Sequence, residues 1–341
     1  MDKLDKHSGC VNAINFNPSG TRLISGSDDK QVVMWDWAIG KAVTWFNSGH
    51  SSNVFQCKFL PLTGDGHIVT CSRDGQIRMA LQNSWGGYDS THQLARHSGP
   101  CHKLTTLPHT PHVFLSAGED ALVMSIDIRT SKPEKLVYVK ENCRKISLYS
   151  IHSNPLTGNE ICVAGEDYYV RIYDRRKIKS DGVAPLKFAP RHFVQPYSVY
   201  VTCALFNYNG SEVIGSYNDD DIYLFDTNHS DNADFVHKYE GHRNSDTVKG
   251  VNFFGPRSEF VVSGSDCGNI YFWDKNTESI VQWMRGDEDG VINCLEPHPR
   301  IPVIATSGLD SDIKIWVPSC EHEPTMTDLR KVCIFLFISF I

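Results

Sequence analysis

The stretch that fixes the fold is Ser25-Gly26-Ser27-Asp28-Asp29-Lys30-Gln31-Val32-Val33-Met34-Trp35-Asp36, because the chain repeats it. A second clear copy runs from Ser263 to Asp274 and again ends in Trp-Asp. More divergent copies end at Ala80, Ile126, Tyr173, Phe225 and Trp316. The final position of the pattern therefore occurs seven times, at intervals of 43 to 52 residues. A period of about 40 to 45 residues ending in Trp-Asp is typical of a four-stranded propeller blade.

Each repeat divides into four short β segments separated by turn residues. In the first repeat these segments are Val11–Phe16, Leu23–Gly26, Val32–Trp35 and Ala42–Phe46. Runs of β-branched and aromatic residues, broken by Asn, Asp, Pro and Gly, predict strands, and no segment keeps a helical apolar period. The sequence therefore predicts an all-β, seven-bladed propeller over residues 1–318, with third strands ending near residues 35, 80, 126, 173, 225, 273 and 316.

Bulk composition narrows the classes of partner. The net charge of −7 argues against nucleic acid, since phosphate contacts need a basic field. One basic cluster, which runs from Arg171 to Lys179 among tyrosines, keeps a nucleic-acid class open as the weakest alternative. The chain has eleven cysteines but no Cys-x-x-Cys pair, and five of them lie in or beside first strands: Cys10, Cys57, Cys101, Cys203 and Cys294. This pattern predicts reduced, buried thiols in an intracellular protein.

Both ends of the chain deviate from the repeats. Residues 1–6 have no apolar core and do not form a signal peptide. Residues 319–341 form a tail that we expect to be disordered or aberrant, the product of truncation or alternative termination, or else a docked closing strand. The last ten residues, Val332–Ile341, are almost wholly apolar, but a membrane helix needs about 20 such residues. We therefore expect no membrane association.

The sequence offers no catalytic or metal-binding pattern. Four of its fifteen histidines recur at one position of the repeats, and the other eleven are scattered. The nearest pair among these, His109 and His112, has no thiol partner at zinc spacing. The chain has no phosphate loop, no nucleophile elbow and no His-Glu-x-x-His motif. We therefore predict a protein that is not an enzyme and that carries no cofactor and no metal.

The repeats resemble the WD40 family, and the resemblance covers about residues 7 to 318. It implies a buried structural hydrogen-bond set that the first repeat holds in full, as His7, Ser25, Asp29 and Trp35. Later repeats keep parts of this set, with His50, His97 and His242 before their first strands, while the sixth repeat has Cys267 at the position of the turn aspartate. Rings of this family close with a strand that precedes the first repeat. Only six residues precede His7, so we expect an imperfectly closed ring whose seventh blade has an open edge.

Two adjacent repeats share a feature that the first and sixth lack. The third repeat ends its third strand in Ile126-Asp127-Ile128-Arg129, and the fourth ends in Tyr173-Asp174-Arg175-Arg176. Strand three crosses the disc, so Arg129 and Arg176 should emerge side by side on the face opposite the turn aspartates. Arginine suits a contact surface because its planar fork makes bidentate bonds. The alternative is that each arginine only pairs with its own aspartate.

The doubled Asp-x-Arg pattern resembles that of the WD40 substrate receptors of cullin-4 ubiquitin ligases, and the chain looks like the factor-eight type of that family. The likeness is carried by His7–Asn12, Gly26–Trp37, Gly165–Arg176 and Asp219–Asp226. It implies a non-enzymatic substrate-recognition subunit that binds the ligase adaptor, damaged-DNA-binding protein 1, and the cullin-4 complex, and that presents unknown protein substrates for ubiquitination. The implied adaptor-binding residues are Asp127, Arg129, Asp174 and Arg176. The resemblance also implies residence in the nucleus and cytoplasm.

The receptors of that family carry an N-terminal extension that has no counterpart here, so we expect this form to be a weak receptor or an inactive one. A generic WD40 scaffold, or a reader of histone tails or other peptides at the channel mouth, remains the alternative function. That alternative predicts an acidic pocket or aromatic cage on the face opposite the two arginines.

Overall fold

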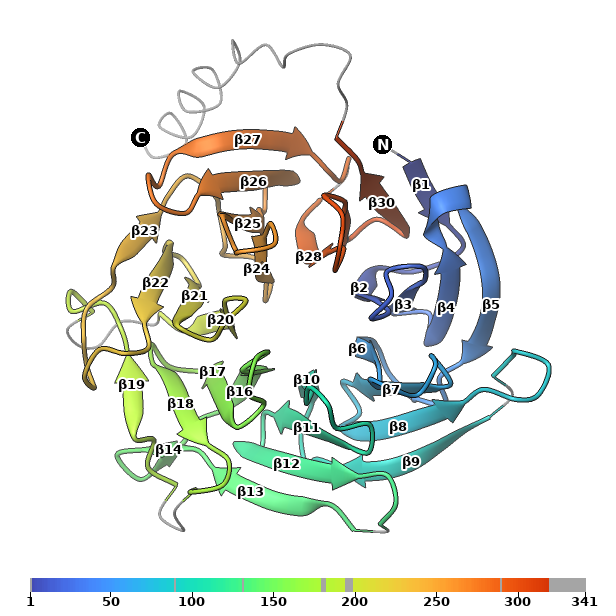
Figure 1. The fold of residues 1–341 in the computed structure, drawn as a ribbon, viewed down its shortest axis with the longest axis horizontal. Coiled ribbons are helices and arrows are strands. Elements are labelled where there is room, and N and C mark those ends of the chain that lie inside the picture. Colours follow the sequence, from blue (N-terminus) through green and yellow to red (C-terminus); the bar gives the residue numbers. More distant parts are fainter. Residues whose placement is uncertain are drawn as a thin grey trace.

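The computed structural model describes residues 2–88, 90–130, 132–178, 182–193, 199–288 and 290–318. Its architecture is a ring of seven blades, each a four-stranded antiparallel sheet (Figure 1). The first strands of the blades line a central channel. Within the described residues the helical content is a single 3-10 turn, Trp37–Ile39. The predicted all-β, seven-bladed propeller is confirmed.

The strands of each blade follow one another from the channel to the rim. The first three blades consist of β2 (Val11–Phe16), β3 (Leu23–Ser27), β4 (Gln31–Asp36) and β5 (Lys41–Asn47); β6 (Val54–Phe59), β7 (His67–Ser72), β8 (Gln76–Leu81) and β9 (Thr91–Arg96); and β10 (Cys101–Thr106), β11 (Val113–Gly118), β12 (Leu122–Asp127) and β13 (Glu134–Tyr138). A small hairpin, β14 (Lys140–Glu141) and β15 (Arg144–Lys145), links the third blade to the fourth.

The remaining blades repeat the same order. They consist of β16 (Leu148–Ser153), β17 (Glu160–Gly165), β18 (Val170–Asp174) and β19 (Leu186–Phe188); β20 (Val201–Phe206), β21 (Glu212–Tyr217), β22 (Ile222–Asp226) and β23 (His237–Tyr239); β24 (Val251–Phe254), β25 (Phe260–Gly264), β26 (Asn269–Asp274) and β27 (Ile280–Arg285); and β28 (Ile292–Pro297), β29 (Ile304–Gly308) and β30 (Asp312–Trp316), which β1 (Asp2–Asp5) completes.

The N-terminal strand closes the ring. β1 pairs antiparallel with β30, from Asp2 opposite Ile315 to Asp5 opposite Asp312, and Leu4 is fully buried. The expectation of an open seventh blade is therefore wrong. Four residues suffice because their partner strand is itself only five residues long. The expected tail, residues 319–341, lies outside the described residues.

The apolar core is shared between blades. Seven clusters of buried apolar side chains each join neighbouring blades. The cluster at the closure brings Leu4 and Ile313 of the seventh blade against Val11 and Trp35 of the first. A single blade cannot cover its own apolar faces, so the closed ring is the unit that excludes water.

The predicted hydrogen-bond set of the first blade is present. His7 contacts Asp29 through Nδ1 at 2.9 Å and Ser25 Oγ through Nε2 at 2.7 Å, while Trp35 Nε1 donates to Ser25 Oγ at 2.9 Å. The second and third blades keep the histidine part of the set without the tryptophan: His50 contacts Asp74, and His97 contacts Asp120.

Three other blades use buried cations where these blades use histidine. Arg171 Nη1 donates to Asp167 at 2.8 Å, and its Nη2 donates to Glu141 at 2.9 Å. Lys249 pairs with Asp266 in the sixth blade. In the seventh blade, Lys314 Nζ lies 2.7 Å from Asp287 and 2.6 Å from Asp310. A buried carboxylate needs a positive or donating partner, and these side chains supply it.

His242 was expected to belong to the structural set, and that expectation is wrong. Neither of its ring nitrogens has a hydrogen-bond partner within the described residues, and its ring packs edge-on against Trp273 at 5.7 Å. Trp273 Nε1 donates instead to the backbone oxygen of Glu240 at 2.9 Å. Cys267 does replace the turn aspartate, as predicted, so the carboxylate of Asp266, one residue earlier, accepts the Ser245 N–H and pairs with Lys249.

The buried ring of His242 predicts a pH dependence of stability. Burial first, and then the charge of Lys249, lower the pKa of His242 to about 4, although Asp266 and Asp220 oppose the shift. An unfolded histidine has a pKa of about 6.5, so between pH 6.5 and 4 the unfolded chain binds a proton that the folded chain does not. The contribution of His242 to the free energy of unfolding should fall by about 3 kcal/mol across that window as the pH drops.

Urea denaturation of the parent chain and of His242→Phe at pH 7 and pH 4.5 measures this contribution. We expect the stability difference between the two pH values to shrink in His242→Phe, because phenylalanine keeps the contact with Trp273 and does not titrate. His229→Phe, at a histidine whose side chain is 54% exposed, is the control and should behave like the parent. An unchanged difference in His242→Phe would contradict the assignment.

Candidate functional site

Asp127 and Asp174 end the third strands β12 and β18 and begin the turns toward the rim. The Oδ1 atom of each accepts the backbone N–H two residues on, from Arg129 at 2.9 Å and from Arg176 at 3.0 Å. The backbone oxygen of Asp127 accepts the N–H of Thr130 at 3.1 Å, and the fourth blade repeats this bond. An aspartate that bonds the backbone ahead of it is the usual way to hold such a turn.

Each arginine of the two turns also forms a bidentate ion pair with its own aspartate. Arg129 donates from Nε and Nη2 to the two oxygens of Asp127 at 3.0 and 2.7 Å, and Arg176 donates to Asp174 at 2.9 and 2.8 Å. Hydrogen bonding by the guanidinium is the main cause that lowers the pKa of each aspartate to about 2. Both pairs therefore stay ionised at neutral pH, and the pairing expected as the alternative is present.

The paired arginines remain open to solvent. The side chain of Arg129 is 64% exposed and that of Arg176 is 58% exposed. Nε and Nη2 carry the bonds to aspartate, and Nη1 donates to no atom of the described residues. The aspartate thus holds the guanidinium in one orientation while leaving a charged edge available for a further contact.

The corresponding turns of two other blades show that arginine is not needed to form the turn. In the fifth blade Asp226 Oδ1 accepts the N–H of Asn228 at 2.8 Å, and in the sixth Asp274 Oδ1 accepts that of Asn276 at 3.1 Å. In the first blade Asp36 pairs with Arg22 instead. The aspartate bonds the backbone in the third to sixth blades, whereas an exposed arginine two residues after it marks the third and fourth.

The two arginine turns lie on one face of the disc, which we call the arginine face. The N–H of Ile128 donates to the backbone oxygen of His112 at 2.9 Å, so this turn lies beside the turn between β10 and β11. Asp120 and Asp167 lie in the turns at the other ends of the same sheets, on what we call the opposite face. The strand registers therefore place the arginines and the turn aspartates on two different faces, as the sequence predicted.

The third and fourth blades are locked together beneath these turns. The N–H of Ser153 donates to Thr105 Oγ1 at 2.9 Å, and Ser153 Oγ donates to the backbone oxygen of Thr106 at 2.7 Å. Gly158 also packs so closely on Pro108 that an added Cβ would lie 2.9 Å from the proline ring. These contacts fix the two turns relative to each other, so the arginines form a preset pair.

The arginines that lie close together in the basic cluster of the sequence have different environments in the structure. Arg171 is buried with Asp167 and Glu141, and Arg175 donates from Nε to the backbone oxygen of Gly158 at 2.8 Å. Of the three arginines in this segment, Arg176 alone ends in the exposed Asp-x-Arg turn. Lys179 lies outside the described residues.

Sequence reasoning missed a row of aromatic rings on the opposite face. Phe55 stacks on His102 with ring centres 4.9 Å apart, His102 meets Tyr149 edge-on at 5.2 Å, and Tyr149 meets Tyr200 at 5.6 Å. Burial, with a smaller contribution from nearby Glu166 and Glu119, raises the pKa of Tyr149 to about 12. The sequence signal that could have revealed this row is an aromatic side chain at the second position of three successive first strands, as Phe55, His102 and Tyr149.

The structure gives no support to a metal centre at its acidic cluster. Asp287, Asp310 and Asp312 lie together, but Lys314 Nζ sits 2.7, 2.6 and 2.5 Å from their carboxylates. A buried ammonium therefore occupies the place that a cation would take. All nine cysteines within the described residues are free thiols. No helix in the described part of the chain is long and apolar enough to cross a membrane.

Comparison with known families agrees with this geometry. The family described as "WD domain, G-beta repeat" (WD40) matches residues 1–36, 41–79, 233–274 and 278–317. The fold is a WD40 β-propeller. The matched segments leave most of the third to fifth blades outside, and these include both arginine turns.

Several characterised proteins resemble the chain over about two thirds of its length. Human DDB1- and CUL4-associated factor 6 is 35% identical over 237 residues, which cover 65% of this chain and 27% of that protein. Human WD and tetratricopeptide repeats protein 1 is 28% identical over 259 residues, 66% of this chain and 38% of that protein. Protein ALTERED SEED GERMINATION 2 of Arabidopsis thaliana is 29% identical over 266 residues, 66% of this chain and 35% of that protein. The WD40 propeller thus spans well under half the length of these relatives.

If the turns do not need their arginines in order to form, replacing these arginines with asparagine should leave the stability of the fold unchanged. We expect the double variant Arg129→Asn/Arg176→Asn to keep the midpoint of urea denaturation, because Asn228 and Asn276 occupy the same turn position. Asp127→Ala should lower the midpoint, because the turn loses the carboxylate that accepts its N–H groups. A double variant that unfolds as early as Asp127→Ala would show that the arginines are structural.

Proposed function

We propose that this protein is a substrate-recognition subunit of a cullin-4 ubiquitin ligase. The two Asp-x-Arg turns on the arginine face, Asp127 with Arg129 and Asp174 with Arg176, would bind the ligase adaptor DDB1. The observation that carries the proposal is this preset pair of exposed guanidinium groups, present on two neighbouring blades where the fold itself does not require them. The likeness to a protein named DDB1- and CUL4-associated factor 6 supports the same partner.

The geometry of the turns suits a docking contact. A guanidinium that is already held by Asp127 or Asp174 loses little side-chain entropy when a partner binds to its remaining edge. The aspartates, whose pKa values are about 2, stay charged and keep that orientation across the physiological pH range. Arginine is also enriched among the residues that contribute most to protein interfaces.

The proposed role requires no catalysis on this chain. The receptor would hold a target protein and the ubiquitin-charged machinery within one complex, so their reaction is accelerated by the raised effective concentration. The arginine face would bind the adaptor. The opposite face and the rim would remain available for target proteins, including partners that are not yet identified.

The decisive test is co-purification of DDB1 and cullin-4 from cells that express either the parent chain or Arg129→Asn/Arg176→Asn. We expect the parent to recover both proteins and the double variant to lose them. Lys132→Asn/Lys177→Asn is the matched control, because it removes the same charge from exposed residues near the same two turns. It should still recover both proteins.

Two results would contradict the proposal. A parent chain that recovers neither ligase subunit would refute docking by this chain. Equal recovery by the parent and by a folded arginine double variant would place the interface elsewhere. Thermal melts of all variants, run in parallel, separate a lost contact from a lost fold.

A peptide reader is the second candidate function, and the aromatic row favours it. Phe55, His102, Tyr149 and Tyr200 line up on the opposite face, and Glu119 Oε1 accepts a hydrogen bond from His102 Nε2 at 2.6 Å. Aromatic faces beside carboxylates attract lysine and arginine side chains. Such a surface could also serve the proposed receptor, as a contact for a basic target segment.

Fluorescence anisotropy with a labelled Lys-Gly repeat peptide tests this reader function, with a Glu-Gly peptide as the negative probe. Tyr149→Ala should weaken binding of the basic peptide by about threefold or more. Tyr208→Ala removes a half-exposed tyrosine that follows a first strand on the arginine face and should leave binding unchanged. The absence of peptide binding by the parent chain would refute the reader function.

A further inference from the structure

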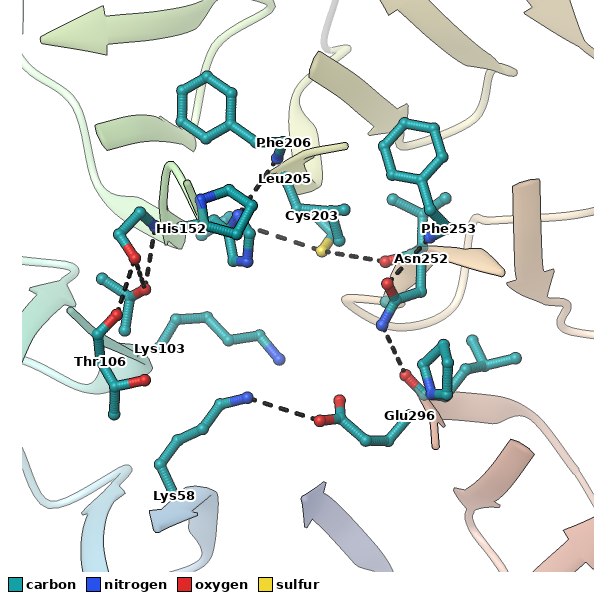
Figure 2. Close-up of a pocket in the computed structure, with 18 of the residues that line it drawn as sticks. Lys58, Lys103, Thr106, His152, Cys203, Leu205, Phe206, Asn252, Phe253 and Glu296 are labelled. Carbon is teal, nitrogen blue, oxygen red and sulfur yellow. Dashed lines mark hydrogen bonds and ion pairs between the residues drawn. The ribbon is translucent and has the colours of Figure 1, made fainter. Parts of the chain in front are cut away.

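The centre of the ring encloses a polar cavity that the docking turns do not use. Its volume is about 560 Å³, and it is lined by the first strands of all seven blades (Figure 2). The lining continues into the turns that follow these strands, at Pro108, Pro155, Pro256 and Pro299. These turns lie on the arginine face, so the cavity reaches the same surface as Arg129 and Arg176.

The cavity is lined by more positively charged than negatively charged side chains. Lys58 and Lys103 both extend into it, as Figure 2 shows, whereas Glu296 is the one carboxylate among the lining residues. Glu296 is already engaged: it accepts a hydrogen bond from Asn15 Nδ2 at 2.6 Å and lies 3.8 Å from Lys58 Nζ. Lys103 forms no ion pair within the described residues. The lining thus carries a net positive charge in a chain whose net charge is −7.

His152 adds a neutral donor to the same wall. Its Nδ1 accepts the backbone N–H of Phe206 at 3.2 Å. Burial, helped by the charge of Lys58, lowers the pKa of His152 to about 3, so the ring is neutral at physiological pH. A neutral ring that accepts at Nδ1 carries its proton on Nε2. The cavity wall therefore offers two ammonium groups and an N–H donor with a single carboxylate.

Two buried lysines elsewhere in the ring show which partner Lys103 lacks. Lys249 is buried against Asp266, and Lys314 against three aspartates. An ammonium that loses water needs a carboxylate partner, and these two lysines have theirs inside the chain. Lys103 would have to find its partner in another molecule when that molecule covers the mouth of the cavity.

We propose that this cavity is a carboxylate-binding pocket that receives an acidic side chain of the protein docked on the arginine face. The assignment rests on the proposed function for the identity of that protein. The net positive charge of the lining favours an anion, and the single ammonium without a carboxylate partner, that of Lys103, calls for one carboxylate. Because the cavity reaches the arginine face, that carboxylate would belong to a side chain of the protein docked there.

Thermal denaturation in the presence of glutarate tests the pocket without any partner. A ligand that binds only the folded chain raises its melting temperature in a saturable way. We expect such a rise for the parent, and an apparent Kd at least about tenfold weaker for Lys103→Met, since a charge-assisted bond is lost. Lys103→Arg should restore binding. Lys132→Met, which removes a lysine outside the cavity lining, should match the parent.

Chloride at equal ionic strength controls for screening. A parent chain that shows no saturable shift with glutarate, or a folded Lys103→Met that binds as the parent does, would overturn the pocket. This readout is independent of the ligase, so it remains interpretable even if docking through Arg129 and Arg176 fails.

Recovery of DDB1 by the same variants tests the occupant. We expect Lys103→Met to recover less DDB1 than Lys132→Met does, and Lys103→Arg to recover as much as the parent. If Lys103→Met loses glutarate binding yet recovers DDB1 fully, the assignment of an acidic side chain from the docked protein is overturned. If Arg129→Asn/Arg176→Asn also recovers DDB1 fully, the proposed docking function fails separately.

Discussion

The structure depends on the pairing of a turn carboxylate with a buried cation or histidine. In the first three blades a histidine bridges the aspartate of the second turn to a hydroxyl on the second strand, as His7 does between Asp29 and Ser25. In the fourth, sixth and seventh blades a buried arginine or lysine forms an ion pair with an aspartate of that turn. Each pair ties strands of a blade together near the opposite face, and the apolar clusters between blades then complete the ring.

This anchoring separates the requirements of the two faces. The turn aspartates on the opposite face are committed to the fold, whereas the turns on the arginine face need only an aspartate that bonds its own backbone. The residue two places later is therefore free to vary: it is Asn228 in the fifth blade and Arg129 in the third. A docking surface can therefore arise at such positions without loss of stability. In the proposed account, Lys58 and Lys103 at the centre of the ring extend that surface into the channel.

The periodicity of the sequence was enough to predict the ring and the strand order, because these follow from short-range patterns that recur. The first hydrogen-bond set was expected from the resemblance to WD40 repeats. The periodicity was not enough for ring closure. The six residues before His7 looked too few for a closing strand, but β30 is short, and four of those six residues are enough to pair with it. It also failed at His242, because the partner of Asp266 is Lys249, which lies seven residues after that histidine.

The candidate site could be predicted in part. Arg129 and Arg176 were readable because Asp-x-Arg recurs in two adjacent repeats. The aromatic row and the lysine-lined cavity were not, because each assembles from residues that are far apart in the chain and ordinary in their own repeats. Lys58 and Lys103 occupy different positions of successive first strands, so no repeat alignment would bring them together, yet both enter one cavity.

The most direct test of the central claim is amide hydrogen exchange of this chain, alone and in complex with purified DDB1. Exchange slows where a bound partner restricts opening and excludes water. The account predicts slower exchange in the turns that contain Arg129 and Arg176, with no change in the turns that contain Asp120 and Asp167. Protection confined to the turns of Asp120 and Asp167, or no protection at all, would contradict it.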